Sequence, residues 1–280
     1  ENMKVTFLDV GQGDCIHIQS EAGVHYLVDG GSSDVSDVGE YRIIPYLKYQ
    51  GISTLEAVFI THPDEDHCNG LMELFRQGKD VGILVKKVYL PDIAESSKSE
   101  SFDEIVEIAE NAGIEVNYLS KGQILSEGEL RFSCMHPEKG YECNEENEYS
   151  LVLEVTYDDF SMLLTGDVEG GGEELLTEYL KEHAVEDKAK DKNKNQDKLM
   201  VLKVAHHGSK NSTSEELLEI LQPAFAVISC GKNNSYGHPH EETIERLEDV
   251  GSRIVITAES GAIMFEIDEE LKIRGYSGEW

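Results

Sequence analysis

The sequence lacks long apolar runs and contains few cysteines. No stretch approaches the ~20 apolar residues that a membrane-spanning helix needs, and no basic and then apolar leader marks a signal peptide. That absence says little, because a start at Glu1 suggests either a trimmed chain or a fragment of a longer protein. The five cysteines are odd in number and have no C-x-x-C spacing, which argues against a disulfide framework or a zinc ribbon and predicts buried small side chains.

Basic residues are also scarce. The chain has 24 Lys and Arg against 56 Asp and Glu, a formal net charge of −32. Such a surface repels nucleic acid, because non-specific DNA affinity comes from Lys and Arg that displace counterions at phosphates. We interpret the excess as a solubilising acidic surface. A polyanionic substrate therefore needs a local cationic site, which bound metal ions can supply.

Apolar strands alternate with helical segments along the chain, without an internal repeat at solenoid spacing. Helical periodicity predicts helices over residues 41–49, 70–76 and 173–181, among others. The arrangement predicts an α/β fold in which two β-sheets lie between helices, as one domain over residues 1–280. A run without apolar anchors predicts a mobile acidic and lysine-rich insertion around residues 184–198.

Polar clusters follow several of the apolar strands, where side chains from distant parts of a chain can converge. The first cluster contains His62, Asp64, Asp66 and His67, directly after the buried strand 55–60. We place it on a loop, where alternate side chains can be aimed at two adjacent metal ions. Imidazole with carboxylate suits zinc, manganese or iron. The alternative is a solvated acidic turn with incidental histidines.

Two further clusters also end apolar strands. Asp167 could bridge two metals, although a Gly-Asp pair at a strand end is usually a turn. Of the adjacent pair His206 and His207, one would bind metal and the other would face the substrate, and the sequence does not decide which.

Other polar residues have supporting roles in this interpretation. His238 could contact a substrate oxyanion, or simply belong to a loop that enters a helix. Asp14 and Asp29 flank glycine turns, and such carboxylates are structural or orient ligating histidines from behind. Lys203 lies near these motifs and could offset the acidic surface locally.

The motif His62-x-Asp64-x-Asp66-His67 resembles the H-x-H-x-D-H signature of the metallo-β-lactamase superfamily, with Asp64 in place of the second histidine. The whole motif set resembles a narrower branch, the C-terminal hydrolase domain of ComEC/Rec2 competence proteins, which take up DNA in natural transformation. Besides the first motif, the segments that carry this resemblance are Asp9-Val10-Gly11-Gln12-Gly13-Asp14, Leu27-Val28-Asp29-Gly30-Gly31, Thr165-Gly166-Asp167 and Ala205-His206-His207-Gly208-Ser209.

The resemblance implies a four-layer αββα sandwich with two divalent ions, Zn or Mn, at one edge of the sheets. β-Lactamases carry a further histidine where this chain reads Asn147-Glu148-Tyr149-Ser150-Leu151, so one metal site has few ligands and a β-lactamase is disfavoured. The resemblance implies that His62 and Asp64 hold one metal, that Asp66 and His67 hold the other, and that Asp167 bridges them. His207, or less favourably His206, would complete the second site.

The implied activity is metal-dependent hydrolysis of a phosphodiester, with DNA as the substrate during competence-related uptake. Asp66 would orient a water whose pKa the metals lower to about 7, while His206 and His238 stabilise charge or protonate the leaving oxygen. Two alternatives remain. One is a phosphodiesterase for small substrates such as phosphorylcholine esters, and the other is a non-catalytic, metal-stabilised docking module.

The resemblance also implies a location and a partner. We expect an extracytoplasmic domain of a cell-membrane protein, whose membrane channel portion would be its partner. A free, soluble cytoplasmic protein is the alternative. The sequence does not indicate the oligomeric state.

Overall fold

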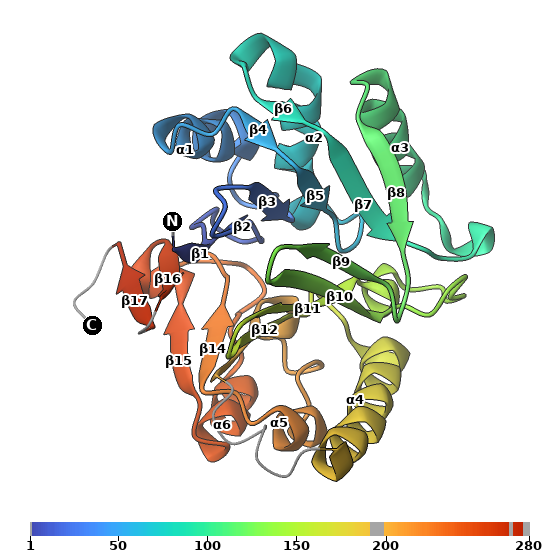
Figure 1. The fold of residues 1–280 in the computed structure, drawn as a ribbon, viewed down its shortest axis with the longest axis vertical. Coiled ribbons are helices and arrows are strands. Elements are labelled where there is room, and N and C mark those ends of the chain that lie inside the picture. Colours follow the sequence, from blue (N-terminus) through green and yellow to red (C-terminus); the bar gives the residue numbers. More distant parts are fainter. Residues whose placement is uncertain (1, 191–198, 269–270, 277–280) are drawn as a thin grey trace.

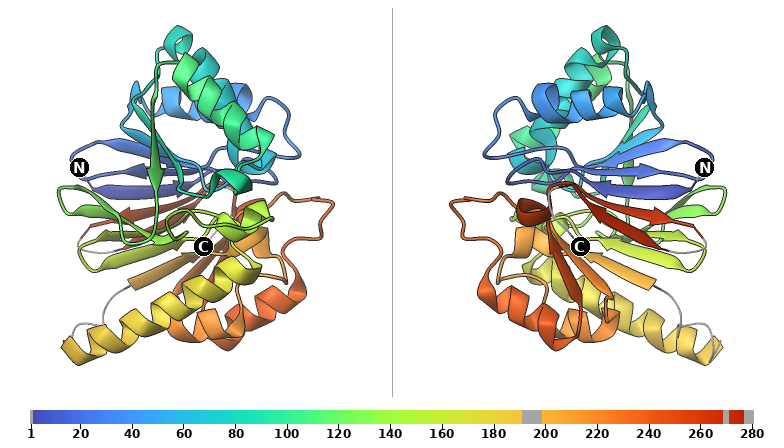
Figure 2. Two further views of the ribbon diagram at one scale, coloured as in Figure 1. Left: turned by 90° about the vertical axis from the view of Figure 1, so that its right-hand side faces the viewer. Right: turned by 90° about the vertical axis from the view of Figure 1, so that its left-hand side faces the viewer.

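Two large mixed sheets form the centre of the protein, and helices cover their outer faces (Figure 1). The computed structural model describes residues 2–190, 199–268 and 271–276. Viewed along the sheets, these residues make four layers in the order helices, sheet, sheet, helices (Figure 2). The predicted α/β sandwich is therefore confirmed.

Long-range pairings build both sheets within the described residues. The order of the eight-stranded sheet is β17 (Lys272–Gly275), β16 (Ile263–Ile267), β1 (Met3–Phe7), β2 (Ile16–Gln19), β3 (His25–Val28), β5 (Ala57–Phe59), β7 (Lys87–Pro91) and β8 (Glu115–Leu119). The order of the seven-stranded sheet is β15 (Arg253–Ile256), β14 (Phe225–Ile228), β13 (Leu199–Lys203), β12 (Phe160–Leu164), β11 (Val152–Tyr157), β10 (Leu130–His136) and β9 (Ile124–Glu127). A small separate pair is formed by β4 (Thr54–Leu55) and β6 (Leu84–Val85).

The helices divide between the two outer layers. The first layer contains α1 (Ile44–Tyr49), preceded by a π-helical turn (Gly39–Ile43), α2 (Glu65–Val81) and α3 (Glu100–Asn111). The second contains α4 (Gly170–Lys190), α5 (Glu215–Leu221) and α6 (Glu241–Asp249), and the short α7 (Thr257–Ser260) follows β15. No helix among the described residues has the length and apolar character needed to cross a bilayer.

Three apolar clusters hold these layers together. The cluster between the sheets includes Phe59, Phe132 and Phe265, all at most 2% exposed. A second cluster packs α1, α2 and α3 on the first sheet, and a third packs α4, α5 and α6 on the second. Because α2, α3 and α6 each bury an amphipathic face, burial of apolar area, at roughly 25 cal/mol per Å², drives the assembly.

Several boundaries differ from the predicted ones. Helix α4 continues to Lys190 instead of ending at residue 181, and residues 191–198 of the predicted mobile insertion lie outside the described residues. Strand β9 was not predicted, because a four-residue edge strand that pairs only with β10 leaves a weak pattern. The cysteines are free thiols, and four of the five are buried, with Cys143 partly exposed.

Candidate metal centre

The candidate site lies where strands of both sheets end. In the first sheet β3 and β5 are parallel, and they lead into Asp29 and His62 respectively. In the second sheet β12 and β13 are parallel, and they lead into Asp167 and the pair His206 and His207. Because the carboxyl ends of parallel strands meet at one edge, residues far apart in the chain face one another there.

The first turn of α2 carries part of the first motif, so its placement entirely on a loop was wrong. Asp64 is the extended residue before the helix, with φ −65° and ψ 146°, and Glu65, Asp66 and His67 are helical. Two carboxylates in a first turn complement the positive end of the helix dipole. Because the helix begins at this point, the His67 side chain points into the interior and has no exposed surface, whereas the Asp64 side chain is 44% exposed.

Two glycine-containing loops fix the backbone of this helical turn. Asp14 N donates to Asp66 O at 3.0 Å, and Gly30 N donates to His67 O at 2.8 Å. A Cβ on Gly31 would lie 2.3 Å from Glu65 O, so only glycine permits this approach. The packing of three backbone segments therefore sets the position of the ligand-type side chains.

His67 is the most constrained side chain of the centre. Its Nδ1 lies 2.8 Å from Asp29 Oδ2, and Asp29 also accepts hydrogen bonds from the backbone and hydroxyl of Thr61, both at 2.8 Å. The opposite nitrogen, Nε2, lies 3.1 Å from Asp167 Oδ1. Burial opposes protonation, but Asp167 and Asp29 raise the pKa of His67 well above its ordinary value.

His207 approaches the same carboxylates from the second sheet. Its Nδ1 donates to Ser229 O at 2.9 Å, which leaves the lone pair of Nε2 pointing at the centre. That Nε2 lies 3.2 Å from Asp66 Oδ2 and 3.4 Å from Asp167 Oδ2. Burial opposes ionisation of Asp167, yet His207, His67 and Lys203 lower its pKa well below the ordinary value.

These atoms fit a bound cation. Within the described part of the chain, the buried Nε2 atoms of His62, His67 and His207 and the Oδ1 atom of Asp167 make no hydrogen bond. Buried polar atoms are otherwise almost always hydrogen-bonded. Ligand atoms of Asp14, His67, Asp167 and His207 also lie within 4.8 Å of one another. Imidazole and carboxylate ligands in this combination suit a divalent transition metal.

Asp14 has an additional partner inside the protein. The ammonium of Lys203, which is completely buried, forms an ion pair with Asp14, donates to Gly166 O at 2.9 Å and lies 3.5 Å from Asp167 Oδ1. Burial opposes its charge, but Asp14 and Asp167 raise the pKa of Lys203 above the ordinary value. Lys203 thus neutralises Asp14, which suits the predicted supporting role of Asp14 better than direct ligation. That role stays a prediction.

His62 and Asp64 form the half of the centre that has fewer ligand-type side chains. The Nδ1 atom of His62 lies 3.0 Å from Thr61 Oγ1, and its Nε2 lies 3.4 Å from Asp64 Oδ2. The contact with His62 holds the pKa of Asp64 well below its ordinary value. The His62 and His67 rings are 4.2 Å apart at their centroids, so the two halves adjoin.

His206 and His238 lie at the mouth of the centre. The Nδ1–H of His206 donates to Glu169 Oε2 at 3.0 Å, and its Nε2 lies 3.9 Å from Asp167 Oδ2. Burial opposes protonation of His206, but Glu169 raises its pKa. The His238 ring is 5.5 Å from that of His206, and burial together with His207 and His206 lowers the pKa of His238 to about 4.

The sequence analysis did not identify three participants. Glu169 orients His206, Gln12 Nε2 lies 3.4 Å from His238 Nδ1, and Glu146 helps to lower the pKa of Asp64. Glu169 was detectable, because it lies two residues beyond Asp167, the last residue of a motif already singled out. Gln12 also lies inside a segment already singled out, but its approach to His238, like that of Glu146 to Asp64, joins distant parts of the chain and leaves no local signal.

Both histidines of the 205–208 turn have left-handed backbone conformations. The φ angles are +50° at His206 and +53° at His207, a region that strains residues other than glycine. We expect the His206→Gly variant to be more stable than His206→Ala by about 1 kcal/mol, because only glycine adopts this region without strain. Urea denaturation of the metal-free variants measures the difference.

The matched control for this comparison is Glu245, an exposed residue inside α6. There the order reverses, with Ala more stable than Gly by about 1 kcal/mol. If His206→Ala proves at least as stable as His206→Gly, the strain is absent.

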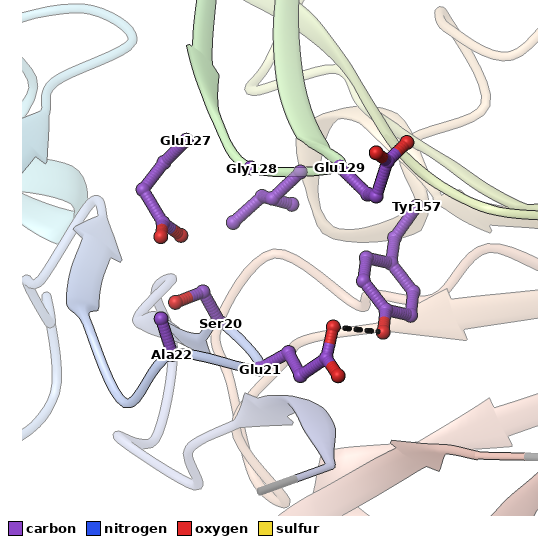
Figure 3. A pocket seen from close by; sticks show the side chains of 8 residues that line it. Ser20, Glu21, Ala22, Glu127, Gly128, Glu129 and Tyr157 are labelled. Atoms are coloured by element: carbon purple, nitrogen blue, oxygen red, sulfur yellow. Dashed lines mark hydrogen bonds between the residues drawn. The ribbon is translucent and has the colours of Figure 1, made fainter.

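A hollow of about 330 Å³ elsewhere on the surface is unrelated to the centre (Figure 3). It lies between the β2–β3 turn and the β9–β10 turn, at the opposite end of β3 from Asp29. Tyr157 Oη donates to Glu21 Oε2 there at 2.9 Å. Glu127 and Glu129 also line it, and these three carboxylates repel a phosphodiester.

The fold and the convergent site together define the class of protein. The profile of the Metallo-beta-lactamase superfamily matches residues 8–232, which include every predicted site residue except His238. The chain belongs to this superfamily, whose fold is that of metal-dependent hydrolases and typically binds divalent metals.

Within the superfamily, the chain is similar to competence proteins, as its motifs predicted. It is 31% identical over 276 residues to ComE operon protein 3 of Bacillus subtilis, covering 94% of this chain and 33% of that protein. It is 30% identical to Recombination protein 2 of Haemophilus influenzae, covering 93% and 28% respectively. The chain therefore spans about a third of the length of these relatives.

Solved structures agree on the fold. The metallo-β-lactamase fold protein YhfI from Bacillus subtilis matches with a TM-score of 0.54 at 13% identity, covering 91% of this chain and 97% of YhfI. Zn²⁺-bound PqqB from Methylobacterium extorquens matches with a TM-score of 0.50 at 10% identity, covering 88% and 85%. At such low identity, the likeness shows the fold alone.

Proposed function

We propose that this chain is a metal-dependent phosphodiesterase that hydrolyses DNA during competence-related DNA uptake. The observation that carries the proposal is the convergence of two buried imidazole Nε2 atoms, those of His67 and His207, on Asp167, with no hydrogen bond to either of them among the described residues. Similarity to competence proteins over 93–94% of the chain supports DNA as the substrate.

The centre would hold two divalent ions, Zn or Mn. Divalent ions there stabilise charge on phosphoryl oxygens and lower the pKa of water to about 7. Asp66, His67 and His207 would hold one ion, His62 and Asp64 the other, and Asp167 would contact both. The positive charge also meets the need for a local cationic site on a chain with a net charge of −32.

The remaining side chains of the site would act on the substrate and on water. Asp66, whose side chain is 19% exposed, accepts a hydrogen bond from the attacking water and orients it. His206 is 26% exposed, and Glu169 fixes its ring with Nε2 3.9 Å from Asp167 Oδ2, from where it would contact the substrate phosphate. With its pKa lowered to about 4, His238 is neutral near pH 7 and contributes a hydrogen bond without charge.

The large negative net charge of the chain supports a second candidate, a phosphodiesterase for small substrates such as phosphorylcholine esters. A small phosphodiester meets less of the repulsive surface than a DNA strand, whose binding depends on many basic contacts.

We also propose that the chain acts as the extracytoplasmic part of a cell-membrane protein whose membrane channel portion is its partner. Similarity to competence proteins about three times as long as the matched segment supports this location.

The nuclease proposal predicts that protein loaded with Mn²⁺ or Zn²⁺ cleaves single- or double-stranded DNA. EDTA should abolish cleavage, and Asp66→Ala should remove it because the nucleophile loses its orienting carboxylate. Fluorescently labelled DNA on a denaturing gel measures the products. The matched control is Asp103→Ala, an exposed aspartate in the first turn of α3, which should cleave like the original protein.

A parallel assay with bis(p-nitrophenyl) phosphate and p-nitrophenyl phosphorylcholine separates the two candidates. Hydrolysis of the small esters with intact DNA would favour the second candidate. If every metal tested leaves both DNA and the esters intact, the phosphodiesterase proposal is wrong.

A further inference from the structure

We propose that Tyr236 stacks on an unpaired base of a single DNA strand, close to the phosphate that is cleaved. This inference rests on the proposed function, because it takes DNA as the substrate. The bases of a duplex already stack on one another, whereas an unpaired base offers a free face to an aromatic side chain. Tyr236 thus favours single-stranded over double-stranded DNA.

A column of aromatic rings leads from the metal centre to Tyr236. The ring of His207, the imidazole that faces Asp167, lies 6.2 Å from the ring of His238, with 31° between their planes. The rings of His238 and Tyr236 are 5.6 Å apart at their centroids and nearly parallel, with 18° between their planes. Both separations are within the range of about 4.5–7 Å that is favoured by paired aromatic rings. Tyr236 therefore lies only two rings away from a ligand-type imidazole.

The Tyr236 ring has a face to offer to a base. The residue is 56% exposed, and since the His238 ring covers one face, the exposed surface belongs to the rest of the ring. A single exposed aromatic residue is ordinary on a protein surface. This one is stacked on a histidine at the mouth of the centre, where a strand bound through its phosphate has to pass. Every base has a flat π face, so such a ring accepts any of them.

Hydrogen bonds fix the loop that carries this ring, residues 231–240. Asn234 Nδ2 donates to His238 O at 2.6 Å, and His238 N donates to Asn234 Oδ1 at 2.9 Å, which closes the loop on itself. Gly231 N donates to Gln12 Oε1 at 3.0 Å, which attaches the start of the loop to the segment between β1 and β2. A ring that is already held in place loses little freedom when a base stacks on it.

The two segments on this side of the mouth contain no acidic residue. Asp and Glu make up 56 of the 280 residues, yet residues 199–214 and 220–240 have none. Each segment has an exposed lysine, Lys210 in the first and Lys232 in the second. Lys210 N donates to His240 Nδ1 at 3.1 Å, so the two segments adjoin. A polyanionic strand therefore meets less repulsion here than a net charge of −32 suggests.

The test compares strands with and without a base on the full, Mn²⁺-loaded chain. The substrates are an end-labelled single-stranded oligonucleotide, the same strand with one abasic residue at successive positions, and its duplex. For the original protein, one abasic position near the cleaved bond should raise KM about 5–100-fold with kcat unchanged, as expected for the loss of one stacked base. Tyr236→Ala should raise KM for the intact strand by a similar factor. It should also no longer distinguish the intact strand from the abasic one, and its cleavage of the duplex should be unchanged.

Two further variants separate stacking from other effects. Tyr236→Phe keeps the aromatic face and should behave like the original protein. Tyr49→Ala is the matched control, because Tyr49 is an 88% exposed tyrosine at the end of α1 and should be dispensable. If Tyr236 only packed on His238, its loss would affect intact and abasic strands equally.

Several outcomes overturn the inference. These are a Tyr236→Ala variant that still distinguishes intact from abasic strands as the original does, and an original protein that is insensitive to every abasic position. If Tyr236→Ala does not fold, Tyr236→Leu, which also lacks an aromatic face, takes its place under the same criteria.

Failure of the nuclease proposal has a different signature. If the metal-loaded original protein cleaves no DNA, that proposal is wrong, and fluorescence anisotropy of the same uncleaved strands decides on Tyr236 separately. Binding that weakens about 5–100-fold both without the base and in Tyr236→Ala supports stacking. Equal binding of all strands by both proteins overturns it.

Discussion

Lys203→Met should lower the free energy of unfolding of the metal-free protein by about 3–5 kcal/mol. Methionine fits the space of the lysine stem but leaves Asp14 buried, 1% exposed, without its cationic partner. Removing one member of a buried ion pair strands the other charge in a low-dielectric interior. Urea denaturation in the presence of EDTA measures the loss, with Lys210→Met as a control at an exposed lysine.

A second substitution distinguishes charge from packing. Adding Asp14→Asn to Lys203→Met removes the uncompensated carboxylate, so the double variant should regain part of the lost stability. Added Mn²⁺ should also reduce the deficit, since the ion supplies positive charge nearby. A loss below about 1 kcal/mol in the single variant would mean that the buried pair contributes little.

Asp167→Asn should abolish hydrolysis and weaken metal binding at least about 100-fold. This is the upper end of the loss in affinity that follows when residues supporting a metal site are replaced. Asparagine preserves the shape of the side chain but removes the charge that faces His67 at 3.1 Å and His207 at 3.4 Å. Metal at 100 times its dissociation constant should stabilise the original protein by about 2.7 kcal/mol. The variant should show little of this increase.

Thermal denaturation with and without Mn²⁺ measures the effect. Asp159→Asn, in the exposed hairpin turn that precedes β12, is the matched control and should show the full stabilisation. Equal stabilisation of Asp167→Asn and the original protein would contradict a central role for Asp167.

The meeting of the main site residues was predictable because each follows an apolar strand. His62, Asp167 and His207 lie in three separate segments, and the carboxyl ends of parallel strands in the two sheets place all three next to His67. The helical start at Glu65 was also readable, since acidic residues at its first positions are a known N-terminal signal. Which atoms bind which ion stays a prediction.

Other features could not be derived from local patterns. Lys203 ends the apolar strand β13, which hints at burial, but its ion pair with Asp14 joins residues far apart in the chain. The order of the sheets likewise depends on remote pairings, such as that of β1 with β16. Neither depends on periodicity or turn chemistry, so neither leaves a local signal.

The centre draws side chains from both sheets, with His67 on the first side and His207 on the second. A cation bound by both imidazoles would link the two halves of the molecule. The five cysteines are free thiols and provide no such link. Loss of such an ion should therefore weaken the contact between the two sheets at the site.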